Sequence, residues 1–127
     1  MTAAPMIYVC VTCRGPSGED APTPAARPGA RLAAAVERAA AGTEVVVRRL
    51  SCFANCSRGP SAALRANGSW TYVFGGLDET NAGALIDGAR LLAGARDGIL
   101  PWRGRPEVLK RNLIARVPPP DFEEKDQ

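Results

Sequence analysis

The architecture is set by Val45-Val46-Val47-Arg48-Arg49-Leu50, a β-branched run that is typical of a strand. The alanine-rich segment from Arg31 to Ala41 predicts a helix before it, ended by Gly42. Met6 to Val9 predicts an earlier strand that ends at Cys10. Strand, helix and strand in this order form a βαβ unit, whose two strands run parallel and whose crossover is right-handed.

Cysteines follow both of these strands. Cys10 and Cys13 close the first strand, and Cys52 and Cys56 come directly after the second, with 38 residues between the pairs. Parallel neighbours end at the same edge of a sheet, so we expect the four thiols to converge there. The chain has no histidine, and four thiolates suit a zinc ion or a small iron–sulfur cluster. The sequence therefore predicts a metal centre on Cys10, Cys13, Cys52 and Cys56.

Other uses of four cysteines remain open. The spacing disfavours a zinc ribbon, whose pairs lie on hairpin turns roughly 15 to 20 residues apart. Dithiol oxidoreduction is an alternative, but an activated Cys-x-x-Cys opens a helix, and here Gly15, Pro16 and Gly18 follow the pair. Two structural disulfides are a further alternative, which a reducing compartment disfavours.

Composition limits the location and the partners. At 127 residues the chain is long enough for one domain, which we place at residues 1–117. The N-terminus lacks a secretory signal and no stretch is long enough to span a membrane, so we expect a cytoplasmic protein without a membrane partner. Residues 118–127 carry four acids and one base and are expected to form a mobile acidic tail. Aromatic residues are few and scattered, which argues against a nucleic-acid partner.

Later segments complete the fold prediction. Arg14 to Gly29 is expected to be a loop, because glycine and proline recur in it. Asn67-Gly68 predicts a hairpin that joins residues 61–66 to the strand from Trp70 to Phe74. A helix is expected from a cap at Thr80 or Asn81 to about Ala95, and another from Glu107 to Arg116. The order is that of an α/β, thioredoxin-like fold: a βαβ unit, an antiparallel hairpin and C-terminal helices.

Two sets of residues carry a family resemblance. With this element order, Cys52-x3-Cys56 followed by Gly59-Pro60 resembles the thioredoxin-like 2Fe-2S ferredoxins. The Cys10-x2-Cys13-Arg14-Gly15 opening and the segments 100–106 and 114–119 are similar to a family of small bacterial predicted metal-binding proteins of unknown function, often found near cobalt or cobalamin genes. The first two cysteines of the ferredoxins are about a dozen residues apart, whereas Cys10 and Cys13 are three apart.

The resemblance implies a function. It implies an electron carrier rather than an enzyme, with a 2Fe-2S cluster, Cys10 and Cys13 on one iron, Cys52 and Cys56 on the other, and no catalytic residues. It also implies a homodimer and a possible place in a cobalamin-related redox step. A zinc-binding structural or metal-handling protein that uses the same four cysteines is the alternative.

Charged and aromatic residues add weaker hypotheses. Arg14 and Arg58 follow the two cysteine pairs and are candidates for tuning a reduction potential, or are simply solvated. A basic C-terminal run is a candidate for docking an acidic redox partner, or is a solvated helix face; it comprises Arg103, Arg105, Lys110, Arg111 and Arg116. Trp70, Tyr72 and Phe74 alternate along one strand face, which favours packing in the sheet over an interaction surface.

Overall fold

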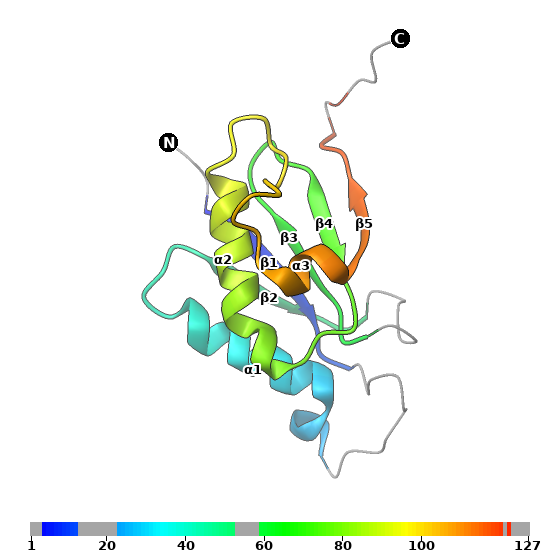
Figure 1. Ribbon diagram of the computed structural model, residues 1–127. Coiled ribbons are helices and arrows are strands. Elements are labelled where there is room, and N and C mark those ends of the chain that lie inside the picture. The colour runs from blue at the N-terminus through cyan, green and yellow to red at the C-terminus, as the bar shows by residue number, and fades with distance from the viewer. Residues whose placement is uncertain (1–3, 13–22, 53–58, 121, 123–127) are drawn as a thin grey trace.

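A computed structural model of the chain describes residues 4–12, 23–52, 59–120 and 122 (Figure 1). These residues form one five-stranded sheet of strand order β2-β1-β3-β4-β5, together with three α-helices and two short 3-10 turns. In chain order the elements are β1 Met6–Cys10, η1 Pro24–Ala26, α1 Pro28–Ala40, β2 Val46–Leu50, β3 Ala62–Arg65, β4 Thr71–Phe74, η3 Glu79–Asn81, α2 Ala82–Ala93, α3 Glu107–Arg111 and β5 Leu113–Val117.

The predicted βαβ unit is confirmed. β1 and β2 pair in parallel, in register from Met6 opposite Val46 to Cys10 opposite Leu50, and α1 makes the crossover. The helix begins at Pro28, earlier than predicted, because a proline at the first helical position has its fixed φ angle in the helical range and needs no hydrogen bond there. Residues 13–22 of the predicted loop lie outside the described part of the chain.

The predicted hairpin is also confirmed. β3 and β4 pair antiparallel with Leu64 opposite Tyr72, and Gly68 in the turn has a φ of 74°, which favours glycine. The hydroxyl of Ser69 accepts a hydrogen bond from the N–H of Ala66 at 2.8 Å, which closes the turn. β3 also pairs antiparallel with β1, so the hairpin extends the sheet from the βαβ unit.

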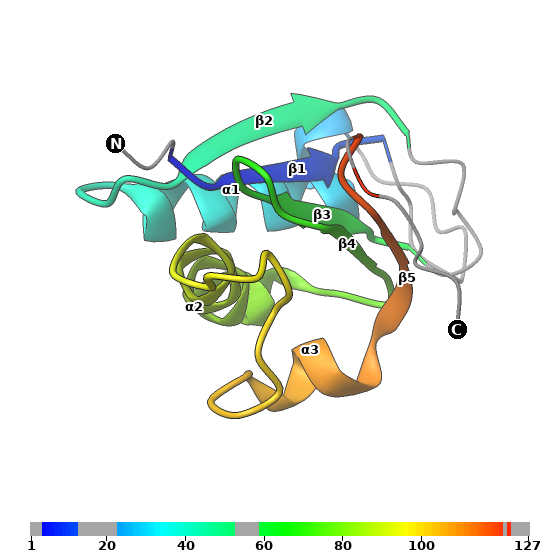
Figure 2. The same ribbon diagram turned by 90° about the horizontal axis from the view of Figure 1, so that it is seen from above.

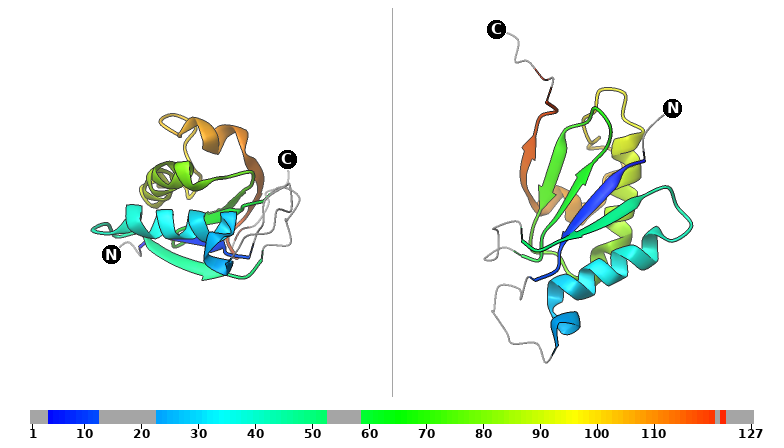
Figure 3. Two further views of the ribbon diagram at one scale, coloured as in Figure 1. Left: turned by 90° about the horizontal axis from the view of Figure 1, so that it is seen from below. Right: turned by 180° about the vertical axis from the view of Figure 1, so that it is seen from behind.

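All three helices cover the same face of the sheet (Figures 2 and 3). The side chains of Ile7, Val9, Leu64 and Phe74 alternate toward that face and are fully buried there. They pack against buried residues of the helices, among them Leu32, Val36, Leu85, Leu92 and Leu109. No helix in the described ranges covers the opposite face, on which Met6, Tyr8 and Val73 are half-buried and Val117 is exposed.

The end of the chain corrects the prediction of a helix from Glu107 to Arg116. α3 ends at Arg111, and β5 then pairs antiparallel with β4, from Phe74 opposite Leu113 to Thr71 opposite Val117. Asn112 makes the turn between them, because its side-chain amide donates to the carbonyl oxygens of Gly75 and Gly76 at 3.0 and 3.2 Å. Apolar, partly β-branched residues after Asn112 then complete the edge of the sheet.

The N-cap of α2 is Asn81, one of the two predicted positions, although its side chain makes no cap hydrogen bond to this helix. Asp78 caps the 3-10 turn η3 before it: the carboxylate of Asp78 accepts from the N–H of Thr80, and the side chain of Asn81 accepts from the N–H of Asp78, both at 2.8 Å. A single 3-10 turn therefore precedes the α-helix, which ends at Ala93. Over the described residues, no helix has the length and apolar character that crossing a membrane requires.

Candidate metal centre

The carboxyl ends of β1 and β2 lie side by side, as predicted. Beyond the strands the parallel pairing continues, since the N–H of Val11 donates to the carbonyl of Leu50 at 2.9 Å and that of Thr12 donates to Ser51 at 3.4 Å. This continuation carries Cys10 and Cys52 to the same edge of the sheet, which we call the cysteine edge. The structure therefore brings together one cysteine from each predicted pair.

Cys10 is held firmly at this edge. Its side chain is 4% exposed, and its Sγ donates to the carbonyl oxygen of Ser51 at 3.2 Å. The N–H of Cys10 donates to the carbonyl of Ser61 at the start of β3, at 3.2 Å. Cys52, by contrast, is exposed. One sulfur is thus shielded by the sheet, whereas the other faces the surface.

The carbonyl oxygen of Ser51 is the polar centre of the edge. Besides the thiol of Cys10, it accepts from both the N–H and the hydroxyl of Thr12. Thr12 and Ser51 belong to no motif that the sequence shows, because their roles depend on the strand register. Groups in this position, hydrogen-bonded around a cysteine, are of the kind that orient the ligands of metal sites in proteins.

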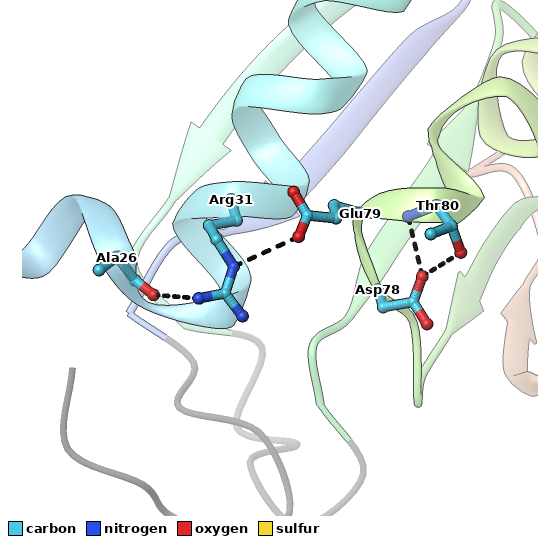
Figure 4. A network of polar contacts seen from close by, with 5 residues as sticks. All are labelled: Ala26, Arg31, Asp78, Glu79 and Thr80. Carbon is cyan, nitrogen blue, oxygen red and sulfur yellow. Dashed lines mark hydrogen bonds and ion pairs between the residues drawn. The ribbon is translucent and has the colours of Figure 1, made fainter.

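Neighbouring segments lie beside the cysteine edge, and Figure 4 shows one contact between them, the ion pair of Arg31 and Glu79. Gly59 and Pro60 are buried and joined by a cis peptide bond, and the carbonyl of Pro60 accepts from the N–H of Leu77 at 3.1 Å. Arg31, in the first turn of α1, donates to the carbonyl of Ala26 at 2.8 Å and lies 3.6 Å from the carboxylate of Glu79. This ion pair joins the start of α1 to the turn before α2.

Two helices therefore begin at the cysteine edge. α1 and α2 both start at the end of the molecule where β1 ends, and both run away from it (Figure 1). The N-terminus of a helix carries a partial positive charge, which favours a nearby anion. An edge with two thiols and two such helix ends suits an anionic metal–thiolate group.

The other predicted ligands lie outside the described residues. These are Cys13 and Cys56, together with the two arginines that follow them, Arg14 and Arg58. Within the described ranges, three or more cysteine, aspartate or glutamate side chains do not gather into a possible metal site. The donor chemistry at the edge fits a thiolate-bound group, and the complete set of four ligands stays a prediction.

The predicted basic run does not form one helix face. Lys110 and Arg111 lie on α3, but Arg116 lies on β5 and Arg103 and Arg105 precede α3. Arg111 is the last residue of α3. It precedes Asn112, whose side chain contacts the segment after β4 at the cysteine edge. The other end of β4 lies away from the cysteines, and there Arg116 stacks over the ring of Trp70, 4.4 Å from its centre.

The alternating aromatic residues of β4 have two different roles. Tyr72 and Phe74 are buried and stacked with ring centres 6.5 Å apart, as the packing prediction requires. The hydroxyl of Tyr72 accepts from the N–H of Leu100 at 2.9 Å. Trp70 is half-buried and contacts Phe122 at 5.1 Å between ring centres, in an edge-to-face arrangement. The packing prediction is therefore confirmed for Tyr72 and Phe74, and Trp70 also packs against the core while its ring contacts Phe122 at the surface.

Comparison with solved structures identifies the class of fold. A thioredoxin-like [2Fe-2S] ferredoxin from Aquifex aeolicus is similar with a TM-score of 0.58 and 17% identity, over 94% of this chain and 97% of that one. A cysteine-to-serine variant of such a ferredoxin from the same organism gives 0.56 and 16%, over 87% and 98%. The wild-type protein gives 0.53 and 13%, over 87% and 96%. The predicted thioredoxin-like α/β fold is confirmed.

The sequence also assigns the chain to a family. Residues 7–119 match the model described as "Protein of unknown function (DUF1636)", and the chain belongs to this family. A search of curated protein sequences finds no match.

Proposed function

We propose that the protein is a one-electron carrier that binds a 2Fe-2S cluster on Cys10, Cys13, Cys52 and Cys56. The observation that carries the proposal is the position of Cys10 and Cys52 at one edge of a parallel strand pair. The fold supports it, because proteins of the same fold are named [2Fe-2S] ferredoxins. In the proposal, Cys10 and Cys13 bind one iron and Cys52 and Cys56 bind the other.

The cluster would supply reversible one-electron redox chemistry when bound. The residues of the chain orient and shield it. Cys10 loses its proton on binding metal and can then no longer donate to the carbonyl of Ser51. The hydroxyl of Thr12 donates to the same carbonyl, and in this proposal it turns to donate to the sulfur instead. We propose that Arg14 and Arg58 add positive charge that raises the reduction potential.

The partner belongs to the same proposal. Electron transfer requires close approach, so a redox protein would dock at the cysteine edge. Arg31 and Arg111 are exposed at this edge, which favours an acidic partner surface. We place the protein in the cytoplasm, where thiols stay reduced before metal binding. The cobalamin-related step rests on the family resemblance alone.

A homodimer is the proposed assembly. The face of the sheet that the helices leave open carries Met6, Tyr8, Val73 and Val117, which are apolar or aromatic and at least partly exposed. Pairing of two copies through this face would bury these side chains. Sedimentation equilibrium of the wild type and of Val73→Glu tests the assembly, because a buried charge at this position should separate the dimer into monomers. Equal molecular masses for the two proteins would reject this interface.

Anaerobic purification tests the cluster. We expect a brown protein that dithionite bleaches, with two irons and two sulfides per chain. Single Cys→Ser variants at the four positions should lose this absorption and retain the far-ultraviolet circular dichroism of the fold. A colourless protein with one zinc would reject the carrier and establish the zinc alternative. A metal-free protein that cycles between thiols and disulfides would establish the dithiol alternative.

A further inference from the structure

A second group of charged side chains lies at the edge opposite the cysteines. Trp102 is 62% exposed, with the guanidinium of Arg105 5.1 Å and the amine of Lys110 5.0 Å from its ring centre. Arg116 stacks on Trp70, and Phe122 contacts the same ring. We call these residues the far-edge surface: Trp70, Trp102, Arg105, Lys110, Arg116 and Phe122.

Arg105 joins the two halves of this surface. Its guanidinium lies 5.8 Å from the ring centre of Tyr72, two positions along β4 from Trp70. It donates to the carbonyl oxygens of Leu100 at 2.6 Å and Pro101 at 3.1 Å, which fixes its orientation. Arg116 lies opposite Tyr72 in the pairing of β4 with β5. Arg105 and Arg116 are therefore both placed beside Tyr72, and two cations share one surface.

Carboxylates do not balance these cations within the described ranges. The ion pairs there join Arg31 to Glu79, Arg49 to Glu37 and Arg90 to Glu44, and none involves Arg105, Lys110 or Arg116. A cavity of about 590 Å³ opens beside Trp102 and Arg105, and Arg96 and Asp97 also line it. The carboxylate of Asp97 accepts from the N–H of Ile99 at 3.1 Å. The surface thus presents fixed positive charge that an anionic segment would neutralise.

The chain carries such a segment next to this surface. Phe122 follows a turn in which its N–H donates to the carbonyl of Pro119 at 3.0 Å, and its ring contacts Trp70. Asp121, Glu123, Glu124 and Asp126 surround Phe122 in the sequence. The five residues after Phe122 reach at most about 17 Å, and Arg116 lies 4.4 Å from the Trp70 ring. The carboxylates are thus within reach of Arg116 and Arg105.

We propose that the far-edge surface is the docking site of the chain's own acidic C-terminal segment, with Phe122 as its anchor on Trp70. Exposed ion pairs are individually weak, so the contact depends on several such pairs and on tethering. A short tether gives an effective concentration in the millimolar range. Docking is therefore intramolecular, reversible and sensitive to salt. It also keeps other acidic segments away from this edge.

Nuclear magnetic resonance of the full chain tests the proposal. The indole N–H signals of Trp70 and Trp102 report on the two halves of the surface. In the wild type, 0.5 M NaCl should shift both signals. The variant D121N/E123Q/E124Q/D126N should show the shifted positions at low salt and lose most of the salt response, and Phe122→Ala should shift mainly the Trp70 signal. The variant E123Q/E124Q should move both signals part of the way in the same direction. The double variant E79Q/D87N removes two charges elsewhere and is its control, which should leave both signals in place.

Addition of the tail in trans completes the test. A synthetic peptide of residues 118–127, added to the D121N/E123Q/E124Q/D126N protein at millimolar concentration, should restore the wild-type signals, whereas a peptide with neutral side chains at the four positions should not. Equal spectra and salt responses of the wild type and the neutral-tail variant would overturn the proposal. Shifts that grow with protein concentration would also overturn it, because they would assign the occupant to a second copy. These readouts need no cluster, so they are independent of the proposed electron transfer.

Discussion

The Sγ of Cys10 donates a hydrogen bond to the backbone carbonyl of Ser51 at 3.2 Å and so links the ends of β1 and β2. The two residues are 41 positions apart in the sequence. Thr12 donates to the same carbonyl through its N–H and its hydroxyl. The carbonyl of Ser51 therefore fixes the relative position of the two segments that carry the cysteine pairs.

Thr12→Val should lower the reduction potential of the proposed cluster. A hydroxyl that donates to a sulfur ligand stabilises the reduced, more negative cluster. If the hydrogen bond stabilises the reduced cluster by about 1 kcal/mol, its loss lowers the one-electron reduction potential by roughly 40 mV. Thr12→Ser keeps the hydroxyl and is the matched control, which should stay near the wild-type value. Potentiometric titration measures the change, and equal potentials for the three proteins at equal iron content would contradict the role of Thr12.

Gly88→Ala should destabilise the protein. A Cβ atom at Gly88 would lie 2.4 Å from Cδ1 of Leu109 and 3.1 Å from Cδ1 of Leu64, so these buried side chains would have to move. Overpacking of this kind costs about 1–3 kcal/mol, partly offset by the better helix propensity of alanine. Gly83, on the same helix, has no atom within 4 Å of an added Cβ, so Gly83→Ala should stabilise. Urea unfolding measures both, and a stabilised Gly88→Ala protein would show that the helix can move outward freely.

Asn112→Ala should loosen the connection between α3 and β5. The substitution removes the two hydrogen bonds from the side-chain amide to the carbonyls of Gly75 and Gly76. The expected loss is about 1–2 kcal/mol in the free energy of unfolding. Hydrogen exchange should show faster exchange of the amides that pair β5 with β4. Arg111→Ala, one residue earlier, serves as the control. Equal exchange rates of these amides in the two variants would mean that the pairing of β5 with β4 holds the connection without the Asn112 side chain.

Glu37 should give a small pH dependence of stability. Its hydrogen bonds to Arg49, at 2.6 and 3.0 Å, lower the pKa of the carboxyl in the folded protein. A lowered folded pKa means that the stabilisation is present above the unfolded pKa of about 4.3 and is lost as the pH falls through the folded pKa. The pair is over 40% exposed on both sides, so the contribution is at most about 1 kcal/mol.

Thermal unfolding of Glu37→Gln and wild type between pH 2 and 7 checks this. The two proteins should differ at pH 7 and converge at low pH, and added salt should reduce the difference. A difference that persists below the folded pKa would have another cause than the charge of Glu37.

The sequence predicted the parts of the fold that depend on local patterns. The βαβ unit follows from a β-branched run after an alanine-rich helix, and the hairpin follows from Asn67-Gly68, whose glycine has the positive φ of the turn. β5 was missed because residues after Asn112 are strand only through pairing with β4. Helix propensity alone does not report such a distant partner. The cap at Asp78 was missed because a 3-10 turn separates it from α2.

The candidate site was predictable to the same degree. The convergence of Cys10 and Cys52 follows from strand order, which the sequence shows. The hydrogen bonds of Ser51 and Thr12 depend on the register of β1 against β2, with Cys10 opposite Leu50, which periodicity does not determine. The sequence indicated three cations of the far-edge surface, Arg105, Lys110 and Arg116, as part of a basic run. Their grouping with the aromatic residues was not predictable, because Arg105 reaches the rings of Tyr72 and Trp102 through the path of the segment between α2 and α3.

The parallel pairing of β1 with β2 also has a consequence for biogenesis. Parallel strands cannot join through a tight turn, so Cys10 and Cys52 share an edge only after α1 has packed against the sheet. An unfolded chain offers the two pairs separately and has no ready-made pocket for a metal. Insertion of the proposed cluster would therefore be a late step in maturation, and a chain with a disrupted crossover should fail to load it even with every thiol intact.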